Sequence, residues 1–325
     1  MARDTLRGVA VGVGLVVLNA WLGDGPAWAQ TAETAGMITE IKVGHGKVEV
    51  KTSGADWRRA TPLNTLHVGD QVRASGDAST VVLLAGGRGS ARIDAQTSPY
   101  TVAGAPPDDT TSQKARSLLS ASLGFLSSGS KEPPKALLST RAGPRRPEIL
   151  TPRNGLVLPG SVEFEWLGSQ FSRYTVRVLD PSGVVLERKG VVGARFTYPA
   201  EAPALQPGIH YRFQVEALGH PPYEAWFEIV DPTRAAAVRD DLAQLEASVG
   251  STVSANSLAA VEAGALASQG LYHNARLVVL AALARDPDEP TLHMLLANLY
   301  LKTGLPRLAA ESLDEAQFLM SREGK

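Results

Sequence analysis

A pattern of small and apolar residues repeats after 34 positions near the C-terminus, and this repeat constrains the fold more than any other feature of the sequence. Small side chains are needed where paired helices cross closely, and a glycine permits the tight turn inside a helical hairpin. Two similar hairpins are therefore predicted, at residues 256–289 and 290–322. The matched pairs are Ala263 and Ala297, Leu266 and Tyr300, Gly270 and Gly304, Ala275 and Ala309, Val279 and Leu313, and Ala282 and Ala316.

The period, the small residues and the "DP" pair at Asp286 and Pro287 together resemble the tetratricopeptide repeat. The resemblance implies that the first helix of each hairpin lines a concave surface, which is the expected peptide-binding surface. Asn256, His293 and Asn298 are the candidate partner-binding residues on it. The alternative is that each of the three is a solvated residue of its helix.

An amphipathic helix is predicted just ahead of the repeats, within a helical region at residues 232–325. Either Asp231 or Thr233 is expected to cap its N-terminus. Two repeats alone bury too little surface to form an independent solenoid. We therefore expect this helix, at residues 234–248, to cover one end of the repeats. Its apolar face consists of Val238, Leu242, Leu245 and Val249.

Residues 36–103 are predicted to form short β-strands separated by turn residues. In "KVEVK", Val48 and Val50 point one way and the charged residues point the other, which is the period of a half-buried strand. The run "TVVLL" is apolar throughout, as expected of a strand that is covered on both faces. A lone aspartate at a strand end, such as Asp70, is expected to accept hydrogen bonds in a turn.

These runs resemble the periplasmic FecR-type domain. The resemblance rests on "GKVEVK", on Trp57 and above all on "LHVGDQVRA", which contains Gly69 and Asp70 and is followed by "VVLL". It covers about 70 residues and implies an all-β domain, solenoid-like or sandwich-like, that binds other proteins rather than catalyses. Trp57, Gly69 and Asp70 are accordingly expected to be structural.

Residues 147–231 are predicted to form a second all-β domain, a two-sheet sandwich. "SVEFEW" places Trp166 on one face of a strand, and "DPSG" from Asp180 has the chemistry of a type I turn. "LQPGIHYRFQV" resembles the corner of fibronectin type III and immunoglobulin-like domains. The resemblance implies that Leu205 and Tyr211 are structural, with the Tyr211 hydroxyl bonded to the backbone of the preceding loop.

The stretch from residue 104 to residue 146 is rich in Ser, Pro, Gly and basic side chains, and it is predicted to be a linker. A short helix within it would carry Leu118, Leu119, Leu123 and Leu126 on one face. Its excess of basic residues is explained either by a solvated linker or by a patch for anionic envelope polymers or headgroups.

The uncharged run from Gly8 to Gly23 follows a short net-positive start, and Ala27 and Ala29 after it fit the pattern read by signal peptidase. Because the run is shorter than the roughly 20 residues of a spanning helix, residues 1–29 are predicted to be a cleaved signal peptide. The alternative is a retained anchor. Export to the periplasm of a Gram-negative bacterium, or secretion, would follow. With no cysteine, the chain must be stabilised by ordinary cores, without a disulfide framework.

The sequence shows no motif for catalysis, for a cofactor or for a metal. The six histidines are scattered without metal-ligand spacing, and "GxSxG" is absent. The net charge of −1 suggests neither nucleic acid nor an acidic partner. No membrane span is expected once the leader is cleaved.

The sequence therefore favours a non-catalytic envelope protein that holds or scaffolds another envelope protein or peptide. One alternative is binding to peptidoglycan or a surface polysaccharide through the basic linker and the FecR-like sheet. Another is a FecR-type signal relay without a cytoplasmic sigma-factor-binding region, because only seven residues precede the apolar run.

Overall fold

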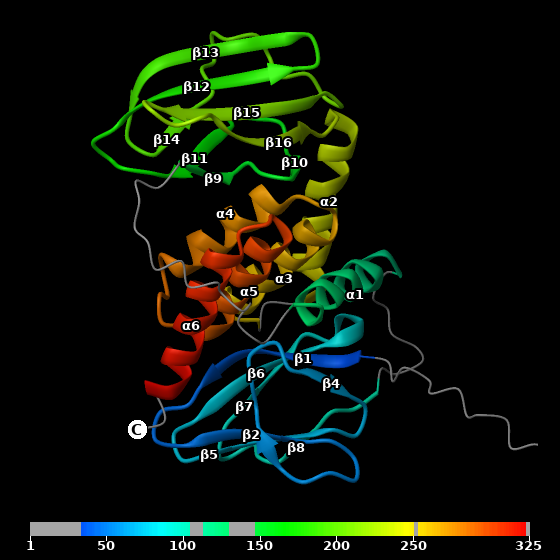
Figure 1. The fold of residues 1–325 in the computed structure, drawn as a ribbon. Helices are drawn as coiled ribbons and strands as arrows, with labels where there is room; N and C mark the ends of the chain where they lie inside the picture. Colours follow the sequence, from blue (N-terminus) through cyan, green and yellow to red (C-terminus); the bar gives the residue numbers. More distant parts are fainter. Residues whose placement is uncertain (1–33, 105–112, 130–146, 250–252, 323–325) are drawn as a thin grey trace, which may run out of the picture. The chain divides into compact units, whose positions relative to one another are not determined.

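A computed structural model describes residues 34–104, 113–129, 147–249 and 253–322. They all belong to one unit of the chain, residues 33–325, in which two β-rich parts are followed by helices (Figure 1). The predicted leader, with Ala27 and Ala29, lies outside the described residues. Among the described residues, none of the helices has the length and apolar character needed to cross a membrane.

The first β part, from β1 to β8, consists of two antiparallel sheets. One has the order β4-β1-β6-β7 and the other β3-β2-β5-β8. Asp70 makes the turn between β4 and β5, where its Oδ2 accepts a hydrogen bond from the His67 N–H at 2.9 Å, and Gly69 there has a φ of +89°. The bounds are β1 Thr34–Lys42, β2 Lys47–Lys51, β3 Arg58–Arg59, β4 Thr65–His67, β5 Gln71–Ser75, β6 Ser79–Leu84, the short 3-10 helix η1 Ala85–Gly87, β7 Ser90–Ile93 and β8 Tyr100–Thr101.

Strand β6 is buried along its whole length, as its uninterrupted apolar sequence predicts. Val82 belongs to the core between the two sheets, whereas Leu83 belongs to a core shared with the helices. The sheet that contains β6 is therefore covered on both faces, by the other sheet and by the helices.

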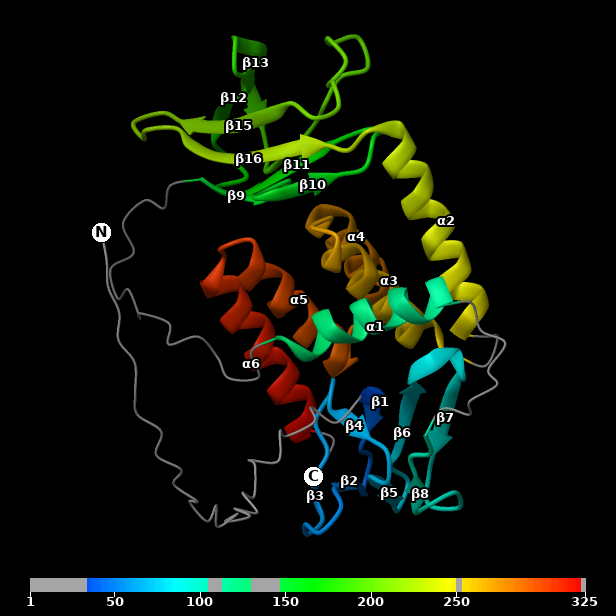
Figure 2. The ribbon, with the colours of Figure 1, turned by 90° about the vertical axis from the view of Figure 1, so that its right-hand side faces the viewer.

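Helix α1, Gln113–Ser127, lies within the stretch predicted to be a linker. Leu119, Leu123 and Leu126 are buried in the core that α1 shares with the C-terminal helices. The helix packs across α3, as Figure 2 shows. The composition of residues 104–146 does not reveal this burial, because the surfaces that cover α1 come from distant parts of the chain, namely η1, α2 and α3.

The crossing of α1 and α3 is close because Gly264 of α3 has no side chain. A Cβ at Gly264 would lie 2.4 Å from Ser122 Oγ and 3.1 Å from the Ser122 carbonyl oxygen. Ser122 Oγ donates a hydrogen bond to the Val261 carbonyl oxygen at 2.7 Å. The fully buried hydroxyl is thus satisfied at the crossing.

The second β part, from β9 to β16, has two sheets that enclose one core. Their orders are β10-β16-β15-β12-β13 and β14-β11-β9, and the β10–β16 pair is parallel. Phe164 stacks on Phe213 at a centroid distance of 4.0 Å. The Tyr211 hydroxyl accepts a hydrogen bond from the Gln206 N–H at 2.8 Å. The bounds are β9 Glu148–Thr151, β10 Gly155–Val157, β11 Glu163–Leu167, β12 Arg173–Asp180, β13 Gly183–Val192, β14 Arg195–Thr197, β15 His210–Ala217 and β16 Tyr223–Ile229.

The C-terminal helical part contains one helix and then two hairpins. Asp231 Oδ1 accepts the Arg234 N–H at the start of the first helix. The turns inside the hairpins contain Gly270 and Gly304 at φ values of +81° and +79°, which a residue with a Cβ rarely adopts. The bounds are α2 Pro232–Val249, α3 Ala255–Ser268, α4 Tyr272–Leu283, α5 Pro290–Lys302 and α6 Pro306–Arg322. Ala275, Ala282, Ala309 and Ala316 are fully buried in the helical core.

The first β part meets the helical part through a buried polar cluster, called here the first contact. Ser257, near the start of α3, donates from Oγ and from its backbone N–H to Glu40 of β1, at 2.8 and 3.2 Å. Glu289 caps α5 by accepting the Thr291 N–H at 3.1 Å. Burial, with Glu40 and Asp286 nearby, raises the pKa of Glu289 to about 8.

The second β part meets the helical part through a different cluster, called here the second contact. Arg276 of α4 forms a buried ion pair with Glu165 of β11 at 2.7 Å. His273 Nδ1 lies 2.7 Å from Thr151 Oγ1. Burial, together with the charge of Arg276, lowers the pKa of His273 to about 4. The turn of the first hairpin is also part of the second contact, because the Leu156 N–H donates to the Gly270 carbonyl oxygen at 2.9 Å.

Candidate binding groove

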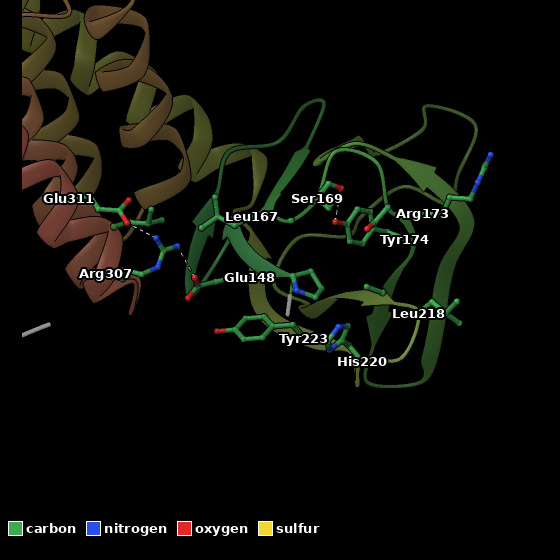
Figure 3. Close-up of a pocket in the computed structure, with 15 residues that line it drawn as sticks. Glu148, Leu167, Ser169, Arg173, Tyr174, Leu218, His220, Tyr223, Arg307 and Glu311 are labelled. Carbon is green, nitrogen blue, oxygen red and sulfur yellow. Dashed lines mark hydrogen bonds and ion pairs between the residues drawn. The ribbon is translucent and has the colours of Figure 1, made fainter. Parts of the chain in front are cut away.

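A groove of about 1030 Å³ lies between one end of the second β part and α6 (Figure 3). Five short segments line it, and they come from β9, the end of β11, the start of β12, the β15–β16 turn and α6. Its size is at the upper end of the range seen for ligand sites in proteins. The lining residues are Pro147, Glu148, Leu167, Gly168, Ser169, Ser172, Arg173, Tyr174, Ala217, Leu218, His220, Tyr223, Arg307, Leu308 and Glu311.

The β side of the groove is largely apolar and aromatic. Leu167 and Tyr223 are half-buried in it, and the Leu218 side chain at its rim is 100% exposed. Phe171, in the loop that leads into β12, is 86% exposed. Tyr174, at the start of β12, is paired with Ala217, at the end of β15, so both loops lie at the same end of the sheet. Exposed large apolar residues beside an open groove are typical of a protein-binding surface.

The loop before β12 depends on a glycine. The Tyr174 hydroxyl donates to the Ser169 carbonyl oxygen at 2.9 Å, and a Cβ at Gly168 would lie 2.3 Å from that hydroxyl. Tyr174 also packs edge-on against the buried Trp166 at a centroid distance of 5.3 Å. The aromatic wall is therefore fixed before any ligand arrives.

The β15–β16 turn holds Leu218 outward. The His220 N–H donates to the Ala217 carbonyl oxygen at 3.0 Å, and Gly219, the third residue of this four-residue turn, has a φ of +80°. A glycine at that position is what a type II turn requires. Leu218 occupies the second position, which projects from the end of the sheet into solvent.

The helical side of the groove is charged. Arg307 of α6 lies 3.6 Å from Glu148 of β9 and also pairs with Glu311, one turn further along α6. Beside this cluster, Arg153 donates to the Tyr223 hydroxyl at 3.1 Å and to the Thr303 carbonyl oxygen at 2.7 Å, just beyond α5. These contacts brace the helical wall against the β wall.

The polar side chains that line the groove include one histidine, His220, and two serines, Ser169 and Ser172. Within the part of the chain that the structure describes, the His220 ring makes no hydrogen bond to Ser169 or Ser172. No group of His, Asp and Glu side chains in that part is arranged to hold a metal ion. His273 and Glu289, whose pKa values are strongly shifted, lie in the two contacts described above and do not line the groove.

The three residues predicted to bind a partner on the hairpins are engaged within the chain. Asn256 donates to Asp286 at 2.7 Å, and the His293 ring nitrogen Nε2 lies 2.7 Å from the Pro287 carbonyl oxygen. Asn298 is only 3% exposed, and a Cβ at Gly129, just beyond α1, would lie 1.9 Å from its amide nitrogen. The end of α1 therefore covers Asn298.

The residues predicted to be structural lie in cores and turns. Trp166 is buried in the core of the second β part, and Leu205 packs against the same core. Trp57 is half-exposed on the first β part, with the Arg73 guanidinium 4.1 Å from its ring centroid. Residue patterns did not predict the groove, because its walls come from segments as distant in sequence as Pro147 and Glu311. The signal available in the sequence was an apolar residue next to a turn-forming glycine, Leu218 before Gly219.

No model of a known protein family matches this chain, and no functionally characterised protein matches it in sequence.

Proposed function

We propose that this protein is a non-catalytic binding protein and that the groove takes an extended, mainly apolar segment of another protein. The observation that carries the proposal is the fully exposed Leu218 at the rim of a preformed, aromatic-lined groove. Leaving large apolar side chains in water has an unfavourable free energy of about 1.5 to 3 kcal/mol each. A partner that covers Leu218 and Phe171 would recover part of it.

The groove suits a peptide with apolar or aromatic side chains and a hydrogen-bonding backbone. Leu167, Tyr174 and Tyr223 offer a rigid apolar wall, on which interface hot spots are usually built. The Arg307 cluster on the opposite wall provides polar rim contacts, which add register and specificity more than affinity.

We also propose the finer assignment of the three parts: a FecR-type first β part, an immunoglobulin-like second β part and tetratricopeptide-like hairpins. The Tyr211 corner bond supports the second assignment. The two turn glycines 34 positions apart, with matching φ values, support the third. Export through the leader would place the protein in the periplasm or outside the cell, where the partner would be another envelope protein or peptide.

The test is a selection of random peptides displayed on phage against the full chain, followed by affinity measurements on synthetic peptides. The selected peptides are expected to be rich in aromatic and aliphatic residues. Leu218→Asp is expected to weaken their binding by about tenfold or more. The matched control is Val184→Asp, the same apolar-to-acidic change at an exposed valine on β13, which should leave affinity unchanged.

Two results would refute the proposal. One is a selection that enriches no peptide, and the other is a set of peptides whose binding is equally insensitive to Leu218→Asp and to Phe171→Asp. Because both side chains are exposed, neither variant is expected to unfold the chain, and a thermal melt checks this.

A further inference from the structure

The outer face of the sheet β3-β2-β5-β8 is basic and does not contribute to the groove. On β2, Val48 and Val50 are buried in the core of the first β part, so Lys47, Glu49 and Lys51 point to the other side. On the neighbouring strands Arg59 and Arg73 both stand opposite Glu49, and Arg59 also donates to the Met320 carbonyl oxygen of α6 at 3.1 Å. Four cations and one carboxylate therefore share this face, which we call the basic sheet face and which carries a net charge of +3.

The one carboxylate of the basic sheet face is covered by its cations. Arg73 Nε lies 2.8 Å from Glu49 Oε2, and Lys47 Nζ lies 3.3 Å from Glu49 Oε1. The hydrogen bond from Arg73, with help from Lys47, holds the pKa of Glu49 below its usual range. Only 12% of the Glu49 side chain is exposed, against 60% for Lys47 and 39% for Arg73. A ligand approaching from solvent would meet the cations first.

An aromatic ring lies beside the cations. The Arg73 guanidinium sits 4.1 Å from the centroid of the half-exposed Trp57 ring, in cation–π geometry. Asp56 and Arg58 flank Trp57 in sequence and offset each other in charge. The guanidinium is thus held between Glu49 and Trp57 and is presented at a fixed place on the sheet.

The side chains exposed on this face favour an extended polymer over a membrane. The large exposed apolar residues of the described chain include Val68 in the first β part, and Val68 follows β4 in the other sheet. No large apolar side chain in the described part of the basic sheet face is highly exposed, so nothing there would insert into lipid. With Trp57 as its aromatic ring, the face also offers no series of stacking platforms for nucleic-acid bases.

We propose that the basic sheet face binds a linear anionic polysaccharide. Neighbouring strands are about 4.8 Å apart, and alternate residues along a strand are about 6.7 Å apart. Arg59 and Arg73 therefore stand about 10 Å apart across the sheet, and Lys47 and Lys51 about 13 Å apart along it. A chain with regularly spaced carboxylates or sulfates can meet several of these cations at once. This site is independent of the groove and of the peptide ligand proposed for it.

The experiment measures binding of the full chain to polygalacturonate, a linear polysaccharide with one carboxylate per sugar, by biolayer interferometry. Dextran is the neutral comparison, and single-stranded DNA and phosphatidylglycerol vesicles are the other polyanions. Polygalacturonate is expected to bind at about 50 mM salt and to weaken by about tenfold at about 200 mM salt. Dextran is expected not to bind.

Three variants locate the site. Lys47→Gln with Lys51→Gln should weaken binding by about tenfold. Glu49→Gln should tighten it by about threefold, because it removes the single negative charge and keeps the hydrogen-bonding shape. Lys189→Glu, on the exposed β13 strand of the second β part, is the control for an unspecific charge effect and should leave affinity unchanged.

Each remaining outcome overturns the proposal. Equal binding of dextran would show that charge is not recognised. Tighter binding of the vesicles or of DNA would assign the face to a membrane or to nucleic acid. Absence of polygalacturonate binding, or equal loss in Lys189→Glu and in the double variant, would also refute it.

Discussion

The two contacts that join the helical part to the β parts are built from opposite chemistry. The first contact places Glu40 and Glu289 at the N-terminal ends of α3 and α5, where a helix end favours negative charge and offers free N–H groups. The second contact pairs Arg276 with Glu165 and buries His273 beside Thr151. At neutral pH Glu289 holds a proton and His273 does not.

The two contacts are therefore expected to respond differently to mutation and to pH. A buried ion pair tolerates replacement of both partners by apolar groups far better than removal of one. A protonated carboxyl and a neutral imidazole make stability depend on pH in opposite directions. Each contact can therefore be broken separately.

The largest effect is expected from removing one partner of the second contact. Glu165→Leu should lower the free energy of unfolding by about 3 to 5 kcal/mol, because the buried Arg276 loses its carboxylate. The double variant Glu165→Leu with Arg276→Met should be less destabilised than Glu165→Leu alone. Urea unfolding of the single and the double variant measures the two free energies. A double variant less stable than Glu165→Leu would contradict the prediction.

A comparable loss of stability is expected from Leu123→Ala in α1, the helix that packs against the first β part. Truncating this buried leucine should cost about 2 to 5 kcal/mol through lost burial and the cavity left behind. Ser120→Ala, an exposed position on the same helix, is the control. If chemical denaturation gave the two variants the same stability, α1 would be a tethered surface helix and not part of the core.

The pH dependence of stability distinguishes the two contacts, because the pKa values of Glu289 and His273 are shifted in opposite directions. The pKa of Glu289 is about 8 in the folded chain against its ordinary 4.5, so the folded chain holds the extra proton between these values. Stability falls there by up to about 1.4 kcal/mol per pH unit as pH rises. The pKa of His273 is about 4 against its ordinary 6.5, so stability rises with pH between those values.

Between pH 4.5 and 6.5 the fall in stability due to Glu289 and the rise due to His273 offset each other. Between pH 6.5 and 8 only Glu289 still contributes, so stability should fall as pH rises. Glu289→Gln should remove this fall and uncover the rise due to His273 at lower pH. Urea midpoints across pH 4.5 to 8 measure both. A variant that kept the full decline above pH 6.5 would count against the buried, protonated Glu289.

The smallest effects come from two glycines. Gly270, whose carbonyl takes part in the second contact, has a φ of +81°, and Gly270→Ala should destabilise by about 1 kcal/mol. Gly124 lies in α1 with open space around its Cα, and Gly124→Ala should stabilise by about 1 kcal/mol. The melting temperature should fall for Gly270→Ala and rise for Gly124→Ala. A shift in the same direction for both variants would contradict these expectations.

Local patterns in the sequence predict local structure well. The alternation of "KVEVK" gives the buried valines of β2, and Asp180 accepts the Gly183 N–H at 2.9 Å in the turn expected from "DPSG". The predicted helix at residues 234–248 corresponds to α2, Pro232–Val249. In each case the forces that decide the conformation act over a few residues.

Features that depend on distant parts of the chain were beyond sequence reasoning. Leu119 and Leu126 suggested a helix, but only α3 shows why they are buried. Asn298 is polar and was expected on an open face, yet residues after α1 cover it. The groove arises because α6 lies beside the end of the second β part, and no periodicity encodes that neighbourhood.

The most direct test of the central claim is hydrogen–deuterium exchange of the full chain with and without a selected peptide. If the groove binds the peptide, exchange becomes slower in the β15–β16 turn around Leu218 and at the start of α6 around Arg307, and it does not change in α5 around Asn298. Protection of α5 and α3, with the β15–β16 turn unaffected, would contradict binding in the groove and would return the binding surface to the face that α1 covers.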